Sequence, residues 1–233
     1  MSKKKVAKTP TLEALNTKQE KLITSILTND MIVAEGPAGV GKTFIVASLA
    51  AELLKGGTFK QIIFTRPVVP CGKSVGYLPG TIEEKMGVWT MPFMNVIKKH
   101  FSQGELDMFL KNGKIQSIPF EVMRGSSFDD CFIILDEAQN STVHEMKMFL
   151  TRVGMYSKTL VMGDTTQSDL HLYGSSESGL DMMKRMIYEQ GMNIPVITFK
   201  SEDIVRSGLC KDWVQAFERD KDLPRFITQP HSS

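Results

Sequence analysis

Residues 36–43 combine the residue types that are needed to hold a chain of phosphate groups. Their sequence, GPAGVGKT, fits G-x-x-x-x-G-K-[ST], in which glycines let backbone amides approach phosphate oxygens closely. The lysine of this pattern reaches the β- and γ-phosphates, and its hydroxyl residue holds Mg²⁺. We therefore predict a site for ATP and Mg²⁺ in this loop, with a glycine turn that binds nothing as the alternative. The predicted binding residues are Gly36, Pro37, Ala38, Gly39, Val40, Gly41, Lys42 and Thr43.

An acidic pair follows four apolar residues in the segment FIILDEAQ (132–139). If the apolar residues form a strand, its carboxyl end delivers Asp136 to the edge where open α/β sheets bind their ligands. Asp136 would then orient the Mg²⁺ shell, and Glu137 would activate the attacking water. Such a pair could also be a solvated turn, but the nearby phosphate-binding pattern favours the catalytic interpretation. A dedicated base for water also favours hydrolysis over the transfer that a small-molecule kinase performs.

A third apolar run ends in polar residues in the segment VMGDTTQ (161–167). Gln167 could bond the γ-phosphate or the lytic water, and so report whether the terminal phosphoryl group is present. The alternative is that Gly163 and Asp164 form the simple turn that ends a strand.

The elements that must position these residues alternate along the chain. Short apolar runs, typical of strands buried on both faces of a parallel sheet, occupy 31–35, 60–65, 131–136, 158–163 and 195–199. Helical patterns occupy 11–29, with a break near 16–17, and 43–54, 82–109, 143–153 and 179–188. This alternation predicts a doubly wound, mainly parallel α/β domain with right-handed crossovers.

Length and composition exclude several classes of protein. The 233 residues suit one domain, for which we expect bounds of 11–220, with a basic tail at 1–10 and a loose tail at 221–233. With 42% hydrophobic and 23% charged residues, the chain is neither disordered nor collagen-like. We expect no membrane span, no secretory signal and, from three widely spaced cysteines, no zinc site; these expectations favour a cytoplasmic protein.

The net charge of +2 is unevenly distributed. Four lysines between residues 3 and 8 contribute +4, so residues 9–233 carry −2. A nucleic-acid surface would therefore have to be a local patch, or be repeated by oligomerisation. The lysine tail could contact phosphate, although a solvated chain end is the simpler interpretation.

Several segments together resemble the PhoH-like ATPases, a branch of RecA-like P-loop NTPases with one core that is related to superfamily 1 helicases. These segments are GPAGVGKT, TRPVVPCGKSVGYLPGTIEEKM, MRG, IILDEAQN followed by MKMFLTRVG, GDTTQSDL, SGL and DIVRSGL. The resemblance covers about residues 17–218 and implies ATP hydrolysis with Mg²⁺, a role linked to RNA or DNA, and a ring that is often hexameric. Lys73 departs from the family pattern, in which many members have an acidic or small residue at this position. We also expect no N-terminal nuclease domain of the kind found in fused relatives, so the resemblance does not imply nuclease activity.

Gln19, ahead of the first expected strand, resembles the glutamine that reads adenine in helicase-like ATPases. A side-chain amide can bond both the N6 donor and the N7 acceptor of adenine, which guanine cannot satisfy. An exposed glutamine without this role is the alternative.

Stabilising the transferring phosphoryl group usually needs a permanent planar cation beyond Lys42. The candidates are Arg66, Arg124, Arg152 and Arg206, each at or near the end of an apolar segment. Because the chain has room for one core, this arginine must come from the same core or from a neighbouring subunit. We favour Arg206 acting on a neighbouring subunit, with Arg152 second; a structural salt bridge or a surface position is the alternative for each.

The segment 66–115 is expected to be an insertion that forms a pore loop or a subunit contact. Its first part, 66–101, interleaves cations with aromatic residues, which suits single-stranded nucleic acid because this ligand needs phosphate neutralisation and stacking. The alternative is that the Trp and Phe residues of this segment, at helical spacing, belong to the core. The predicted nucleic-acid contacts are Arg66, Lys73, Tyr77, Lys85, Trp89 and Arg124.

These inferences predict an Mg²⁺-dependent ATPase that works as a homo-oligomeric ring and couples hydrolysis to single-stranded RNA or DNA. The alternative is a nucleotide-dependent switch or binding module, whose slow hydrolysis changes its affinity for a partner without displacing a strand.

Overall fold

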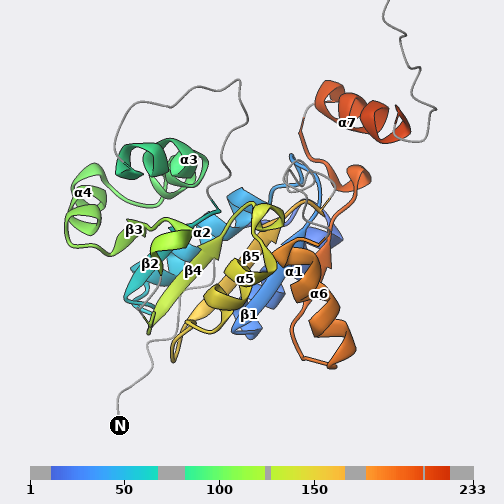
Figure 1. Ribbon diagram of the computed structural model, residues 1–233. Coiled ribbons are helices and arrows are strands. Elements are labelled where there is room, and N and C mark those ends of the chain that lie inside the picture. The colour runs from blue at the N-terminus through green and yellow to red at the C-terminus, as the bar shows by residue number, and fades with distance from the viewer. Residues whose placement is uncertain (1–11, 68–81, 124–126, 166–176, 207, 221–233) are drawn as a thin grey trace, which may run out of the picture.

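The fold is built around one six-stranded parallel sheet (Figure 1). The computed structural model describes residues 12–67, 82–123, 127–165, 177–206 and 208–220. Its strands are β1 (Met31–Glu35), β2 (Gln61–Thr65), β3 (Ile115–Ser117), β4 (Cys131–Leu135), β5 (Lys158–Gly163) and β6 (Val196–Thr198). They are ordered β3-β2-β4-β5-β1-β6, and all pairings are parallel. This arrangement confirms the predicted doubly wound α/β fold.

Helices cover both faces of the sheet (Figure 1). One face packs against α1 (Thr17–Thr28), α2 (Lys42–Lys55), α3 (Ile82–Ile97) and α4 (Gln103–Lys111). The other face packs against α5 (Val143–Leu150), α6 (Gly179–Glu189) and the short 3-10 helix η1 (Phe120–Met123). The last helix, α7 (Gly208–Asp220), lies apart from the sheet (Figure 1). The result is a three-layer domain with one hydrophobic cluster on each side of the sheet.

The central strands are apolar along most of their length because both of their faces are covered. In β1, Ile32 and Ala34 belong to the cluster under α1 to α4, whereas Val33 belongs to the cluster under α5 and α6. Strands β2, β4 and β5 alternate in the same way. This burial on two faces explains why the sequence shows continuous apolar runs instead of alternating ones.

The helical pattern at 82–109 is not one continuous element. It divides into α3 and α4 around a turn, and α4 starts at a capping box. The Ser102 hydroxyl accepts a hydrogen bond from the Glu105 amide, while the Glu105 carboxylate accepts one from the Ser102 amide. This reciprocal capping satisfies amides at the start of α4 and sets its first residue.

Other element boundaries agree with the sequence prediction or differ by a few residues. The break expected near 16–17 is confirmed, because Asn16 caps α1 and its side chain accepts from the Gln19 amide. Helix α5 ends at Leu150, three residues before the predicted end. Strand β3 and helix α7 were not predicted: β3 has only three residues, and α7 directly precedes the segment 221–233 that we expected to be loose.

The described part of the segment 66–115 contributes to the core. Phe93 and Phe101 are 2% and 8% exposed and belong to the same cluster as α1 and α2. The alternative that the aromatic residues of this segment are core residues is therefore confirmed for Phe93 and Phe101. A pore-loop or subunit-contact role for the rest of the segment stays a prediction.

The topology brings three chain segments to one edge of the sheet. Strand β5 lies between β1 and β4, and the carboxyl ends of the three strands point the same way. The Gly36 amide, after β1, donates to the Gly163 carbonyl at the end of β5 (3.0 Å). Ligands of such sheets bind beyond the carboxyl ends of the strands, so the residues that follow β1, β4 and β5 form the candidate site. Within the described residues, no helix has the length and apolar character needed to cross a membrane.

Candidate functional site

The loop predicted to bind phosphate connects β1 to α2. Gly36, Gly39 and Gly41 have φ angles of 132°, 91° and 91°, which residues with side chains rarely adopt. A side chain at Gly36 would also have no room, because its Cβ atom would lie 2.4 Å from the Phe199 carbonyl oxygen. Gly41 directly precedes α2 and has no side chain to cap it, so the first amides of the helix are left for an anion. The backbone of this loop therefore fits the phosphate-binding interpretation.

Lys42 lies among carboxylates at the centre of the site. Its Nζ donates hydrogen bonds to the carbonyl oxygens of Gly36 (2.5 Å) and Pro37 (2.9 Å). Burial lowers the pKa of Lys42, and the charges of Asp164, Asp136 and Glu137 oppose this decrease. The structure thus brings the predicted lysine and the predicted acidic pair together.

The acidic pair follows β4, where the sequence predicted it. The Asp136 amide donates to the Thr65 carbonyl (2.9 Å), which holds the end of β4 beside β2. Burial raises the pKa of Asp136 to about 6, and the negative charge of Glu137 adds to this effect, whereas Arg66 and Lys42 oppose it. Glu137 has a φ of 52°, a left-handed conformation that is uncommon for a residue with a side chain. Strained backbone of this kind often occurs at functional sites.

Gln139 is a site residue that sequence reasoning missed. It is 1% exposed, and its Nε2 donates to Glu137 Oε2 at 2.6 Å. Its Oε1 accepts from the Asp164 amide at 3.0 Å. The side chain therefore connects the end of β4 to the end of β5. The sequence signal that could have marked Gln139 was its position two residues after the predicted base, Glu137. In the structure it lies on the short 3-10 helix η2 (Ala138–Asn140).

Asp164 was interpreted only as part of a turn. In the structure it is 8% exposed and, of the three carboxylates, has the largest effect on the pKa of Lys42. Like Asp136, it follows a fully buried strand, and this shared position could have marked it as a candidate. Gln167, three residues later, lies outside the described residues, so its proposed contact with phosphate stays a prediction.

Glu35 is a second residue that the sequence did not single out. It ends β1, directly before the loop, and its carboxylate accepts from Lys184 Nζ (2.5 Å) and from Thr198 Oγ1 (2.7 Å). Its side chain is 8% exposed. The ion pair with Lys184 attaches α6 to β1, and the hydrogen bond from Thr198 attaches β6 to β1. Both contacts therefore stabilise the strand that leads into the loop.

Gln19 is buried against the loop, at 3% exposure. Its Nε2 donates to the Val40 carbonyl (2.9 Å), and its Oε1 accepts from the Leu15 amide (2.8 Å). The alternative of an exposed glutamine is therefore wrong.

Arg206 lies beside the loop of its own subunit. The Val205 amide donates to the Gly39 carbonyl (3.1 Å), and a Cβ atom on Gly39 would lie 3.2 Å from Arg206 Cδ. This position does not fit our expectation that Arg206 reaches the site of a neighbouring subunit. The reason is that the segment after β6 folds back over the loop, where Asn16 Nδ2 also holds it by donating to the Asp203 carbonyl (3.3 Å).

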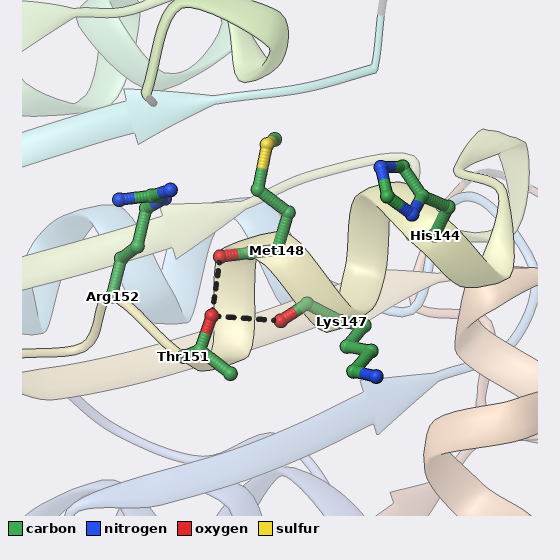
Figure 2. A pocket seen from close by; sticks show the side chains of 5 residues that line it. All are labelled: His144, Lys147, Met148, Thr151 and Arg152. Atoms are coloured by element: carbon green, nitrogen blue, oxygen red, sulfur yellow. Dashed lines mark hydrogen bonds between the residues drawn. The ribbon is translucent and has the colours of Figure 1, made fainter. Parts of the chain in front are cut away.

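Arg152 lies near the opposite edge of the sheet. It follows α5, and its carbonyl accepts from the Phe128 amide (3.4 Å), three residues before β4 begins. The structure therefore does not bring Arg152 to the loop of its own subunit. Its Nε is buried and has no hydrogen-bond partner in the described part of the chain, and the side chain lines an open cavity of about 400 Å³ along α5. Figure 2 shows this cavity, which is lined by His144, Lys147, Met148, Thr151 and Arg152.

Two of the residues predicted to contact nucleic acid, Arg66 and Trp89, contact each other. The Arg66 guanidinium lies over the Trp89 ring, 5.4 Å from its centroid, and Arg66 also lowers the pKa of Asp136. These two residues thus border the acidic pair. Lys73, Tyr77 and Arg124 and the side chain of Lys85 lie outside what the structure describes.

The ligand types at the loop fit Mg²⁺. The Thr43 hydroxyl and the Asp136 carboxylate are hard oxygen donors, and Mg²⁺ is usually bound through one or two such groups together with substrate phosphates and waters. Within the described residues there is no group of three or more His, Cys, Asp or Glu side chains that could hold a metal ion. A metal at this site would therefore depend on the phosphates of the nucleotide for its remaining ligands.

Comparisons with known proteins agree with the motif pattern. A family model described as PhoH-like protein matches residues 11–218. The PhoH-like protein of Bacillus subtilis (strain 168) is 37% identical over 202 residues, which are 86% of this chain and 62% of that protein. Protein PhoH of Escherichia coli (strain K12) is 38% identical over 206 residues, 88% of this chain and 57% of that protein. The chain thus spans about three fifths of the length of these curated relatives.

Solved structures share the fold at low sequence identity. The large terminase from a thermophilic bacteriophage has a TM-score of 0.54 and 12% identity, and covers 87% of this chain and 50% of its own. The HK97 bacteriophage large terminase has a TM-score of 0.54 and 13% identity, and covers 92% and 48%. These similarities concern the fold alone.

Proposed function

Because this chain belongs to the PhoH-like protein family, we propose that it hydrolyses ATP with the help of Mg²⁺. The observation that carries this proposal is that Lys42, at the centre of the glycine-rich loop, lies close enough to Asp136, Glu137 and Asp164 for their charges to affect its pKa. A cation and a glycine-rich loop bind phosphates, and an adjacent carboxylate can activate water. The three features together suit phosphoanhydride hydrolysis.

The residues have distinct roles in this proposal. The loop amides and Lys42 bind the β- and γ-phosphates, and Thr43 and Asp136 would hold Mg²⁺, which neutralises phosphate charge when bound. Glu137 accepts a proton from a water molecule while the water oxygen attacks the γ-phosphorus. The bond between that phosphorus and the bridging oxygen breaks, and ADP and inorganic phosphate leave.

The substitution Glu137→Gln tests the catalytic assignment. It keeps the size of the side chain but removes the base, so we expect ATP turnover to fall by at least about 100-fold while ATP binding is retained. Glu189→Gln, at an exposed glutamate on α6, is the matched control and should change neither quantity. Undiminished hydrolysis by Glu137→Gln would refute the assignment.

We further propose that hydrolysis is coupled to single-stranded RNA or DNA. The stacked Arg66 and Trp89, at the border of the acidic pair, support this proposal because they offer a cation and a ring next to the chemistry. The ATPase rate is measured with and without single-stranded RNA or DNA at two salt concentrations, and we expect stimulation that weakens at higher salt. A rate that is indifferent to nucleic acid would instead favour the nucleotide-dependent switch.

We propose that the chain forms a ring, with a hexamer expected from the family resemblance, in which Arg152 acts on a neighbouring subunit. The position of Arg152 supports this role, because it lies far from its own loop and lines an open cavity, and its buried Nε has no hydrogen-bond partner among the described residues. Mixing inactive Glu137→Gln subunits with inactive Arg152→Ala subunits should restore part of the activity, because intact sites then form between unlike neighbours. Light scattering reports the mass of the assembly, and no rescue at any ratio would argue against the contribution of Arg152.

A further inference from the structure

Two cavities flank the phosphate-binding loop, and they differ in their lining. One of about 290 Å³ includes Asp164 and Glu35 and lies on the carboxylate side. The other, of about 370 Å³, is lined by loop residues 38–43 and by Phe44, Pro92, Val96, Val205 and Arg206. We call this second cavity the apolar loop cavity. It is within the size range of pockets that take small ligands.

The position of the carboxylates indicates which cavity takes the nucleoside. If the γ-phosphate lies beside Lys42 and Glu137, the other two phosphates follow the loop amides away from the negative charges. The nucleoside of the bound molecule then extends toward Phe44, at the start of α2. The apolar loop cavity lies on this side, so its apolar side chains are positioned to contact the base.

The side chain of Gln19 faces the loop and not this cavity. Both ends of its amide bond backbone groups, the donor to Val40 and the acceptor to Leu15. A Cβ atom on Gly41 would lie 2.7 Å from Gln19 Nε2, so the amide packs directly against the loop. The amide keeps a second N–H and a second lone pair, but Gln19 is only 3% exposed, so a base could reach them only if the residues around the amide moved.

We infer that Gln19 is a positioning residue for the phosphate-binding loop, and that the apolar loop cavity holds the base by nonpolar contact without selecting adenine. Val40 and Gly41 form part of the loop that binds the phosphates. The hydrogen bond from Gln19 to Val40 therefore holds the loop in the conformation that binds phosphate. Among the described polar side chains that line the cavity, Lys42 and Thr43 are assigned to the phosphates and Mg²⁺, and Arg206 offers donors only, so no side chain is left to accept from the N6 amino group of adenine. The site would then accept ATP and GTP alike. This inference rests on the proposed function.

The experiment compares three ligands that share phosphates but differ in the base: ATP, GTP and inorganic tripolyphosphate. Binding is measured by calorimetry with Mg²⁺ on the full chain that carries Glu137→Gln, which prevents turnover. We expect the affinities for ATP and GTP to lie within about tenfold of each other, because an apolar pocket discriminates weakly. Substituting Gln19→Met, which removes both hydrogen-bonding groups, should lower the affinity for all three ligands by a similar factor of about ten.

A control separates loop positioning from general stability. Ile26→Val removes one buried methyl group two turns further along the same face of α1. It should lower the melting temperature but leave the affinity for tripolyphosphate unchanged at temperatures where circular dichroism shows both variants folded. Equal effects of Gln19→Met and Ile26→Val on tripolyphosphate affinity would overturn the positioning role.

The remaining outcomes are distinguishable. A loss by Gln19→Met that is confined to ATP, with tripolyphosphate unaffected, would show that Gln19 reads adenine and would overturn the inference while the proposed function stands. A uniform loss together with ATP binding more than about 100-fold tighter than GTP would overturn the base tolerance alone. Binding of none of the three ligands would overturn the proposed function itself.

Discussion

The side chain of Gln139 donates a 2.6 Å hydrogen bond to the carboxylate of Glu137, while its other end accepts from the backbone after β5. A buried amide with these two contacts holds the carboxylate in one orientation. The ends of two strands that are adjacent in the sheet but far apart in sequence thereby share one polar link.

Removing this link should impair chemistry more than binding. Gln139→Met keeps the volume but frees the Glu137 carboxylate, and we expect kcat for ATP hydrolysis to fall by about 10- to 100-fold with little change in KM. Gln190→Met, at an exposed residue after α6, is the control. A kcat within twofold of the unsubstituted protein would show that Glu137 needs no such support.

Substituting Gly36→Ala should destabilise the protein strongly. The new Cβ atom would lie 2.4 Å from the Phe199 carbonyl oxygen, at a φ of 132°, so either the loop or the backbone directly after β6 must move. We expect a loss of about 2 to 4 kcal/mol in the free energy of unfolding, measured in urea.

Gly87→Ala is the matched control for Gly36→Ala. Gly87 lies inside α3, and apart from its chain neighbours and the backbone of its own helix, no atom of the described residues lies within 4 Å of the added Cβ. Alanine should therefore stabilise the protein slightly, by up to about 1 kcal/mol. Similar effects of both substitutions would mean that the close approach to Phe199 does not limit residue 36.

The ion pair between Glu35 and Lys184 should be strongly coupled. Lys184→Met leaves the nearly buried Glu35 carboxylate with the Thr198 hydroxyl as its described partner, and we expect a loss of about 1 to 3 kcal/mol. Adding Glu35→Gln should recover part of this loss, because the uncompensated charge is removed. The coupling energy from urea unfolding of the four variants checks this, and additive effects would contradict it.

Stability should depend on pH through Asp136 in the metal-free protein. Its pKa is raised by folding from 3.8 to about 6, so the folded state binds the proton more tightly than the unfolded state. The favourable contribution is complete below pH 3.8 and is lost as the pH rises through about 6. Asp136→Asn lacks this loss, so at pH 7.5 it should be more stable than the unsubstituted protein by about 1 to 3 kcal/mol.

Unfolding of both proteins in urea with EDTA, between pH 4.5 and 7.5, tests this prediction. The difference in free energy between the two proteins should grow with pH. A difference that stays constant over this range would mean that the carboxyl of Asp136 ionises with an ordinary pKa.

The sequence determined much of the fold and the centre of the site, because both depend on local patterns. Covering both faces of a sheet requires continuous apolar runs, and these runs located the four longer strands. The loop at 36–43 and the pair Asp136 and Glu137 were recognisable because phosphate binding and water activation require fixed residue types at the ends of strands. Short elements such as β3 gave no comparable signal, since three residues cannot establish a period.

Only the tertiary structure decided which polar groups meet. Gln139 connects residues after β4 and β5, Gln19 bonds a loop 21 positions later, and Arg206 lies over Gly39. Each of these contacts joins segments that sheet order and helix packing bring together. The sequence of a segment shows which hydrogen bonds its side chains can donate or accept. Long-range packing decides the partner, because a buried polar group forms a hydrogen bond with whichever group the fold places beside it.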